Sequence, residues 1–215
     1  MRQIIQSAVN FSEGRRSEVI EAIVDAARGA SDVVVADYSA DADHNRMVVT
    51  FLGGPDGIRE AVFASAECAV ELIHLPTHKG AHPRIGAVDV VPLVPVQGVS
   101  MSECVDLSRL IGTDFADRLG VPVCFYEYSA LSDRSKLPDI RRGGFEALLE
   151  GELTGHRKPD LGPSRAHGSA GVTVLGARGP LVAYNINLDT SDMHATRAIV
   201  RTIRSGEAGL TGFWR

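Results

Sequence analysis

The sequence contains few cysteines and no long apolar run. Its three cysteines, Cys68, Cys104 and Cys124, form no Cys-x-x-Cys pair. We therefore expect reduced, mostly buried thiols, as in a cytoplasmic protein. No apolar stretch is long enough to span a bilayer, and Met1 runs into a strand pattern without a signal peptide. A cytoplasmic location without a membrane partner is the expectation that follows.

Several functional signatures are also missing. Lysine and arginine number 22 against 27 acidic residues, which gives a formal net charge of -5, and no basic run offsets it. This balance argues against a nucleic-acid partner. The Walker loop, the Rossmann glycine fingerprint and the Gly-x-Ser-x-Gly elbow are absent as well. Nucleotide-driven and serine-hydrolase chemistry therefore lack support.

The apolar periodicity predicts an α/β (α+β) fold. Strand, helix, strand, strand, helix and strand follow one another in the first half of the chain, at 2–10, 18–28, 33–36, 47–52, 58–73 and 87–94. We expect Ser17 to cap the first helix, Gly29 to end it, and 33–36 to be buried on both faces. This β-α-β-β-α-β order is the ferredoxin-like plan. Pro92 and Pro95 predict that their strand frays or lies at an edge.

Further elements extend this sheet, with helices packed on one face. We predict a helix over 101–119, a strand at 121–126, an irregular stretch over 129–170, strands near 171–176 and 180–188, and a helix over 191–204. The chain is divided accordingly into two parts, 1–178 and 179–215.

The most distinctive stretch is the polar loop from His78 to Arg84, which contains two imidazoles. A histidine in an ordered loop can take and give a proton near neutral pH, so His82 is a candidate acid/base. The alternative is an imidazole that only hydrogen-bonds to the backbone. His74, His78 and His82 are spaced four apart, as zinc ligands on a helix would be. Pro76 and Gly80 break such a helix, so no metal is expected.

A second polar segment, from Asp37 to Arg46, is predicted as a loop. It holds three carboxylates near an imidazole, an amide and a guanidinium. One interpretation is a solvated, capped turn. The other is a substrate site in which carboxylates contact a cationic group and Arg46 holds a substrate carboxylate.

Five segments occur in the order seen in one enzyme family: Val9–Gly14, His44–Arg46, His78–Asp89, Gly162–Ser164 and Ala183–Leu188. Through them the chain resembles the glutamate formiminotransferases, which also form the N-terminal part of formiminotransferase-cyclodeaminase. The resemblance implies transfer of a formimino group from N-formimino-L-glutamate to N5 of tetrahydrofolate, in histidine degradation. Tetrahydrofolate would be a co-substrate, and no metal would take part.

The resemblance also assigns residues. His82 becomes the catalytic acid/base, and Gly162, Pro163 and Ser164 lie beside the folate. The substrate-binding candidates are polar residues of the motifs and of the 37–46 segment: Asn10, Asp37, Asp41, Asn45, Arg46, His78, Lys79 and Arg84. Among them, Asp37 or Asp41 would face the amidine-like formimino group, and the cations would hold the carboxylates of the substrates.

The family is built from two similar subdomains whose sheets face one another across the folate. The resemblance implies that residues 1–178 correspond to the N-terminal subdomain, and 179–215 to the start of a C-terminal one that we expect to be truncated. An uncovered strand edge would favour a homodimer. The alternatives are a non-catalytic folate-binding module, a related enzyme acting on 5-formyltetrahydrofolate, and, less favoured, a metal enzyme.

Overall fold

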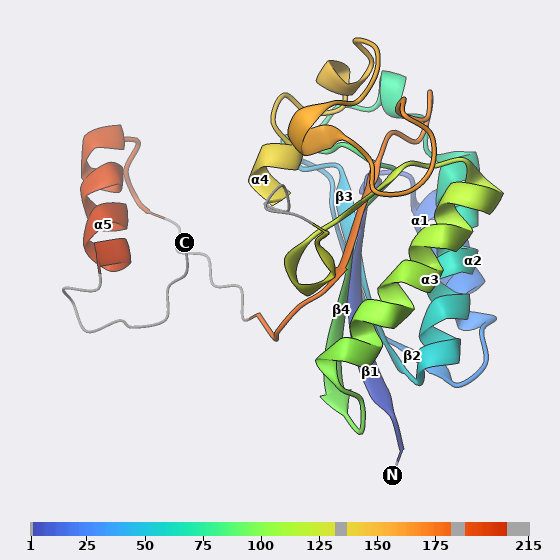
Figure 1. Ribbon diagram of the computed structural model, residues 1–215. Helices are drawn as coiled ribbons and strands as arrows, with labels where there is room; N and C mark the ends of the chain where they lie inside the picture. The colour runs from blue at the N-terminus through green and yellow to red at the C-terminus, as the bar shows by residue number, and fades with distance from the viewer. Residues whose placement is uncertain (1, 132–136, 182–187, 206–215) are drawn as a thin grey trace. The chain divides into compact units, whose positions relative to one another are not determined.

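The computed structural model describes residues 2–131, 137–181 and 188–205 (Figure 1). The chain divides after Pro180 into two compact units. The second unit contains one described helix, α5 (Met193–Ser205), where the sequence predicts a helix over 191–204. The predicted strand at 180–188 and the motif from Ala183 to Leu188 fall largely on 182–187, which lie outside the described residues.

A six-stranded sheet forms the centre of the first unit, as the predicted α/β class requires. Its strands are β1 (Ile4–Phe11), β2 (Val33–Asp41), β3 (Arg46–Gly53), β4 (Val88–Gln97), β5 (Val123–Phe125) and β6 (Thr173–Ala177). They lie in the order β2-β3-β1-β4-β6-β5. The first four pair antiparallel, whereas β6 pairs parallel with both β4 and β5. The sheet therefore joins an antiparallel half to a parallel half at β4.

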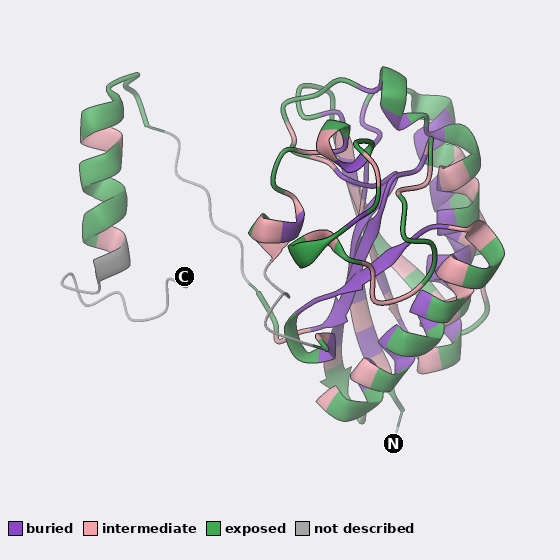
Figure 2. Ribbon diagram, turned by 45° about the horizontal axis from the view of Figure 1, so that its top comes forward, coloured by how far each residue is buried: buried purple, intermediate pink, exposed green. Residues whose placement is uncertain are grey.

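Three long helices cover one face of this sheet (Figure 1). They are α1 (Ser17–Arg28), α2 (Pro55–Leu72) and α3 (Met101–Leu119). Every second residue of β1, from Ile5 to Phe11, is fully buried beneath them. The intervening residues are half-buried, because strand side chains alternate between faces. Figure 2 shows this contrast between the buried sheet and the exposed outer helix surfaces.

Among its described residues, the irregular segment predicted over 129–170 contains the short helical pieces α4 (Leu137–Ile140), η3 (Glu146–Leu148) and η4 (Gly155–Arg157), and η2 (Glu127–Ser129) leads into it. Ile140 and Leu148 from this segment pack with Val90 and Val174 in a second buried cluster. Val91 belongs instead to the core beneath the helices. Adjacent strand residues point to opposite faces, so this segment covers the other face of β4 and β6.

The prediction for 33–46 is wrong in two respects. Strand β2 continues to Asp41, so the first half of the expected loop is strand. It is also an edge strand and not one buried on both faces, since Val34 is 60% exposed. An apolar run records which side chains can be buried and does not record the position of a strand in the sheet. Consequently Asp37 and Asp41 lie on a strand.

The prediction for Pro92 and Pro95 is also wrong, because β4 lies inside the sheet between β1 and β6. Both prolines fall where the ladder with β1 is irregular. The pairing is interrupted opposite Pro92, between the pairs Gln6–Val94 and Asn10–Val90, and its register shifts next to the pair Ile5–Pro95. A missing backbone donor is tolerated at such irregularities.

The start of α1 differs from the prediction too. Ser17 is its first helical residue and makes no cap, although Gly29 ends the helix as expected. The buried carboxylate of Glu13 accepts hydrogen bonds from the backbone N–H groups of Gly14, Arg15 and Arg16 at 2.9–3.0 Å. Burial would raise the pKa of Glu13, but these bonds and the charge of Arg16 hold it below its ordinary value. A carboxylate before the helix thus replaces the predicted serine cap.

The three cysteines are free thiols, with Cys104 and Cys124 buried and Cys68 half-buried. Burial raises the pKa of Cys104 to about 11. In the parts of the chain that the structure describes, no helix is long and apolar enough to cross a bilayer.

Candidate active site

The loop with the two histidines, residues 78–84, lies against the turn between β2 and β3. The backbone N–H of Ala81 donates to the carbonyl of Asp43 at 3.0 Å. Gly80 permits this approach, because a Cβ at that position would lie 2.2 Å from the backbone oxygen of His44. A larger residue would push the loop away from the turn. The glycine of the motif therefore sets where the histidines stand.

Asn45 connects this loop to the end of β1. Its backbone is left-handed, with φ of 49°, a conformation that asparagine tolerates better than most residues. The side-chain oxygen accepts from the N–H of Gly14 at 2.9 Å, and the side-chain nitrogen donates to the carbonyl of Lys79 at 3.0 Å. Asn45 is buried and both its side-chain polar atoms are used, so it holds the loop in place.

His78 is buried beneath the loop. Its Nε2 lies 2.9 Å from the carbonyl oxygen of Asn45, which can only accept, so Nε2 carries a hydrogen. Its Nδ1 is buried and has no partner among the described residues. Burial is the main reason why the pKa of His78 lies below its ordinary value. This histidine is thus neutral and shielded from solvent.

His82 has a carboxylate partner. Its Nε2 lies 3.3 Å from Oδ2 of Asp89, a residue of β4 that is 1% exposed. The other oxygen of Asp89 accepts from the backbone N–H groups of Ile85 and Gly86 at 2.8 and 3.3 Å. The guanidinium of Arg141, which follows α4, also contacts Oδ2. His82, Asp89 and Arg141 therefore form one network that joins the loop, the sheet and the irregular segment.

The pKa of Asp89 reflects this network. Burial would raise it, but the hydrogen bond with His82 and the positive charge of Arg141 bring it below its ordinary value. The carboxyl group is therefore ionised at neutral pH. Sequence reasoning missed Asp89 as a site residue although it ends the motif that contains His82. Arg141 lies 52 residues from Asp89 in sequence and had no signal to identify it.

Asn10 and Arg46 lie together on the sheet face that the helices leave uncovered. Arg46 donates from Nη1 to Oδ1 of Asn10 at 3.0 Å. Asn10 pairs across the sheet with Val90, the residue that follows Asp89. The register thus places this polar pair close to the strand position from which Asp89 reaches His82.

The two candidate carboxylates differ in their surroundings. Asp37 is exposed on β2 and pairs with Thr50 of β3. Asp41 accepts from the backbone N–H groups of Asp43 and His44 at 2.9 Å and forms an ion pair with the His44 ring at 3.0 Å. The backbone hydrogen bond from His44 is the largest cause of the lowered pKa of Asp41. Asp41 therefore caps its turn, as the solvated-turn interpretation expects.

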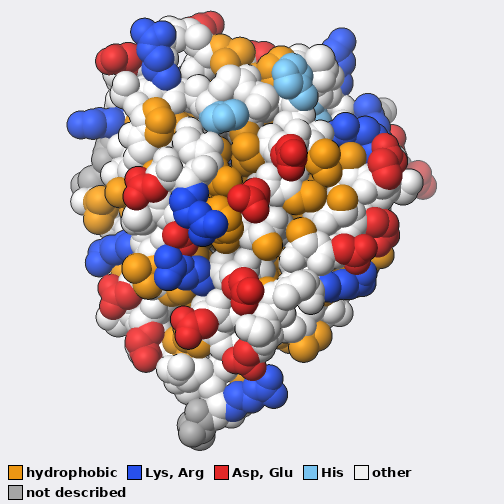
Figure 3. All heavy atoms as spheres, turned by 90° about the vertical axis from the view of Figure 1, so that its right-hand side faces the viewer, with side chains coloured by type: hydrophobic (Ala, Val, Ile, Leu, Met, Phe, Trp, Pro, Cys, Tyr) orange, Lys and Arg blue, Asp and Glu red, His pale blue; other side chains and the backbone are white. Residues whose placement is uncertain are grey.

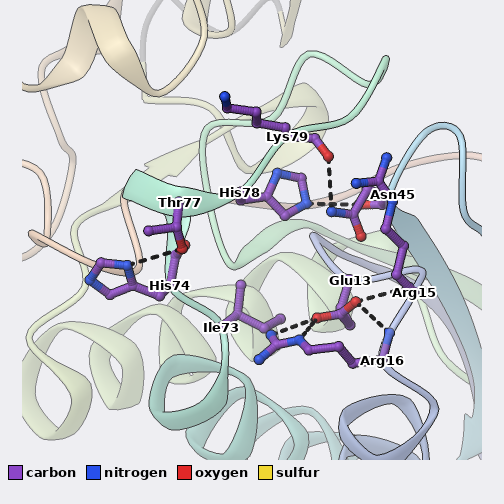
Figure 4. Close-up of a pocket in the computed structure, with 9 residues that line it drawn as sticks. All are labelled: Glu13, Arg15, Arg16, Asn45, Ile73, His74, Thr77, His78 and Lys79. Carbon is purple, nitrogen blue, oxygen red and sulfur yellow. Dashed lines mark hydrogen bonds and ion pairs between the residues drawn. The ribbon is translucent and has the colours of Figure 1, made fainter.

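The two cations of the loop differ as well. Arg84 forms a bidentate ion pair with Glu146, at 2.7 and 3.0 Å, and donates to the carbonyl of His78 at 2.9 Å. Lys79 is exposed. In Figure 4 its side chain points away from Glu13 and Ile73. Of these two, Lys79 reaches solvent more readily.

A cavity of about 390 Å³ lies behind the loop (Figure 4). Nine residues line it: Glu13, Arg15, Arg16, Asn45, Ile73, His74, Thr77, His78 and Lys79. The cavity brings together Asn45, His78 and Lys79 of the predicted site, but His82 is not among its lining residues. The side of the molecule covered by helices, in contrast, mixes acidic, basic and apolar side chains (Figure 3).

The turn Gly162–Ser164 is exposed. Gly162 has a φ of +85°, which favours glycine, and a Cβ there would approach Ala116 of α3 and Pro122 within 3.2–3.3 Å. The carbonyl of Ser164 accepts from the N–H of Leu153 at 2.7 Å. These contacts attach the turn to α3 and to the irregular segment.

The three histidines spaced four apart do not converge on one point. His74 faces Thr77, with Nδ1 3.4 Å from its hydroxyl, whereas His78 and His82 face Asn45 and Asp89. Among the described residues, no group of three or more histidine, cysteine or acidic side chains is arranged to hold a metal ion.

An imidazole with one nitrogen on a buried carboxylate, as Nε2 of His82 is on Asp89, has the arrangement of a general acid/base. A sequence profile of the formiminotransferase domain, N-terminal subdomain, matches residues 4–178. The chain belongs to the formiminotransferase family.

Named relatives match nearly the whole chain. The glutamate formimidoyltransferase of Streptococcus pyogenes serotype M1 is 40% identical over 97% of this chain and 70% of its own length. The protein of the same name from Thermoplasma acidophilum is 41% identical, over 97% and 69%. The formimidoyltransferase-cyclodeaminase of Rattus norvegicus is 42% identical over 96% of this chain but only 38% of its own length.

Proposed function

We propose that this protein transfers the formimino group of N-formimino-L-glutamate to N5 of tetrahydrofolate, with His82 as the acid/base. The family and the names of the two prokaryotic relatives support the reaction. The observation that carries the role of His82 is its network. Both histidine side chains of the loop are largely buried, but Nδ1 of His78 is a buried atom without a partner, whereas Nε2 of His82 lies on the carboxylate of Asp89 and its Nδ1 is not among such buried atoms.

The reaction needs one proton removed and one supplied. N5 of tetrahydrofolate attacks the formimino carbon, and the amine that attacks must lose a proton. Glutamate then leaves as an amine and must gain one. A single imidazole can do both in turn, and such catalysis contributes about 10²–10⁴-fold in rate. Holding the two substrates in reacting geometry supplies a larger share of the acceleration.

The polar residues around His82 fit the charges of these substrates. Arg46, which Asn10 holds on the uncovered sheet face, is placed to bind a carboxylate, and Lys79 offers a second cation. Arg84 can bind a carboxylate only by exchanging Glu146 for it, since that pair is already bidentate. Asp37 is the better candidate for the cationic formimino group, because Asp41 already caps a turn.

Tetrahydrofolate is the co-substrate, with Gly162, Pro163 and Ser164 beside it. Residues 1–178 act as the N-terminal subdomain, and 179–215 begin a second one. We also expect a cytoplasmic homodimer in which an exposed strand edge is covered. A monomer seen by light scattering at micromolar concentration would contradict the dimer.

The test is a transfer assay on the purified chain and on His82→Gln. We expect tetrahydrofolate-dependent loss of formiminoglutamate with the wild-type chain. His82→Gln should lower kcat at least about 10²-fold without changing the fold, because a loop imidazole contributes little core packing. His156→Gln, which alters an exposed histidine in η4, is the control and should keep full activity.

Three results would count against the proposal. Full activity in His82→Gln would remove its acid/base role. Tight folate binding without turnover by the folded wild-type chain would indicate a binding module. Turnover of 5-formyltetrahydrofolate in place of formiminoglutamate would indicate the related enzyme.

A further inference from the structure

We propose that Asp89 is a positioning residue that fixes the tautomer of His82, with Arg141 as its counter-charge, so that Nδ1 of His82 exchanges the proton. This inference rests on the proposed function and goes further by naming the reacting atom and two residues behind it. Asp89 and Arg141 do not contact the substrate in this scheme. They act only through the imidazole.

The tautomer follows from the chemistry of the pair. An ionised carboxylate can only accept hydrogen bonds, so Nε2 of His82, 3.3 Å from Oδ2 of Asp89, carries a hydrogen. In the neutral ring, Nδ1 is then the atom with a lone pair. No described residue gives Nδ1 a hydrogen-bond partner, and it is not among the buried polar atoms without one. Nδ1 therefore keeps some contact with solvent, although the His82 side chain as a whole is 10% exposed.

Asp89 is suited to hold the His82 ring because hydrogen bonds to both of its oxygens fix the orientation of its carboxylate. Its oxygens meet four donors: two backbone N–H groups, from Ile85 and Gly86, on Oδ1, and His82 with Arg141 on Oδ2. Rotation of the carboxylate would exchange partners that the backbone fixes. Both amides belong to the segment that links the loop to β4. The Asp89 carboxylate therefore fixes the position of the loop and the orientation of the His82 ring together.

His78 provides an internal comparison. It has the same tautomer as His82, because its Nε2 donates to the carbonyl of Asn45. However, its Nδ1 is buried, and its partner is an uncharged carbonyl that cannot balance an imidazolium. Only His82 combines an open Nδ1 with a negative charge at Nε2. The difference in partners therefore distinguishes the two rings of one loop.

The proton balance is closed by the ring alone. Nδ1 takes the proton from the attacking N5 amine, and the ring becomes an imidazolium whose Nε2–H stays on Asp89. The same Nδ1 proton then passes to the leaving glutamate nitrogen, and the neutral ring is restored. Arg141 contacts the same oxygen of Asp89 as His82 does and offsets the charge of that carboxylate.

Asp89→Asn tests the positioning role. The amide has one oxygen for the four donors, and it should stay with the two backbone N–H groups, which cannot move. Its NH₂ group then faces His82 and displaces Arg141, a flexible side chain. Nε2 must accept, so Nδ1 carries the hydrogen and loses its basicity. We expect kcat to fall about 10²–10⁴-fold, as for other wrong-tautomer histidines.

The control is Asp114→Asn, which removes a carboxylate from an aspartate–arginine ion pair elsewhere in the fold. Asp114 of α3 binds Arg59 of α2 at 2.7 and 3.0 Å, between the helices. This variant should keep wild-type kcat. Asp89→Asn activity equal to that of Asp114→Asn would overturn the positioning role.

A second readout depends neither on activity nor on the folding of an Asp89 variant. Nitrogen-15 NMR of the histidine rings of the wild-type chain, with the His82 signals assigned by their loss in His82→Gln, reports the tautomer directly. We expect the hydrogen on Nε2 at neutral pH. A hydrogen on Nδ1 would overturn the inference even if transfer occurs. Absence of transfer with the expected tautomer would instead contradict the proposed function alone.

Arg141→Gln tests the counter-charge through the pH profile. Without Arg141 the charge of Asp89 favours the imidazolium, so the acid limb of kcat/KM should move up by about one pH unit. Arg141→Lys should restore it. The other charged groups next to the loop are the same in all these variants: the pairs Asp41–His44 and Arg84–Glu146, and Glu13, Arg15 and Lys79. An unshifted profile in Arg141→Gln would contradict the counter-charge role.

Discussion

Substitutions at Asn45 separate the contribution of its left-handed backbone from that of its two side-chain hydrogen bonds. Asn45→Gly keeps the left-handed backbone possible and removes both side-chain hydrogen bonds, to Gly14 and to Lys79. Asn45→Ala removes the same bonds and also places a Cβ in the left-handed region. The difference in the free energy of unfolding between the two variants therefore gives the cost of a Cβ in the left-handed region. The loss in the glycine variant gives the contribution of the hydrogen bonds.

The magnitudes follow from the surroundings of each partner. A hydrogen bond contributes about 0.5–1.5 kcal/mol to folding. The N–H of Gly14 keeps a second acceptor, Glu13, at 3.0 Å, and Lys79 is exposed, so water can reach its carbonyl. We therefore expect Asn45→Gly to lower the free energy of unfolding by about 1–2 kcal/mol. A non-glycine residue in the left-handed region costs about 1–2 kcal/mol more, so Asn45→Ala should lower it by about 2–4 kcal/mol.

The assay is urea unfolding followed by far-ultraviolet circular dichroism. Asp32 supplies the matched control, because it is exposed, has a φ of 51° and its side chain makes one long hydrogen bond, of 3.4 Å, to Arg2 among the described residues. Its alanine and glycine variants should differ by the same backbone term, while Asp32→Gly stays within about 0.5 kcal/mol of wild type. If Asn45→Gly also stays within that margin, Asn45 does not hold the loop.

Two further changes probe the same region. Gly80→Ala should lower transfer at least about 10-fold and stability by about 1–3 kcal/mol, because its Cβ would lie 2.2 Å from the oxygen of His44. Gly168→Ala, with no atom within 4 Å, should match wild type; equal effects would refute the argument. The lowered pKa of Glu13 means that its stabilisation is present above pH 4.5 and is lost as pH falls through the folded value. Glu13→Gln should therefore unfold more easily at pH 7 and lose less stability on acidification, and identical pH dependences would contradict this.

The sequence predicts the helices and the order of the strands well, because periodicity reports which side chains each element buries. It does not report the neighbours of a strand. Pro92 and Pro95 are typical of an edge, yet β4 is internal, and its ladder with β1 is irregular where they occur. Similarly, β2 has an apolar start like that of a buried strand but lies at the edge. Both errors concern pairing, which is a property of segments far apart in sequence.

In the candidate site, too, the contacts between residues far apart in sequence could not be predicted. The loop from His78 to Arg84 could be identified from its residues, and a family resemblance could assign His82. The carboxylate behind that ring lies seven residues later, and the guanidinium behind the carboxylate lies 52 residues later. A single sequence has no signal for such contacts. Asn45 and His78 likewise resemble ligand contacts in sequence, although the protein uses both side-chain polar atoms of Asn45 and the Nε2 atom of His78 in its own hydrogen bonds.

The most direct test of the central claim follows the transferred carbon itself. Formiminoglutamate labelled with carbon-13 in the formimino group is mixed with tetrahydrofolate and the purified chain, and the label is observed by NMR. We predict that the label moves from the glutamate nitrogen to N5 of the folate with the wild-type chain and stays on glutamate with His82→Gln. A label that remains on glutamate in the presence of the folded wild-type chain would contradict the proposed transfer.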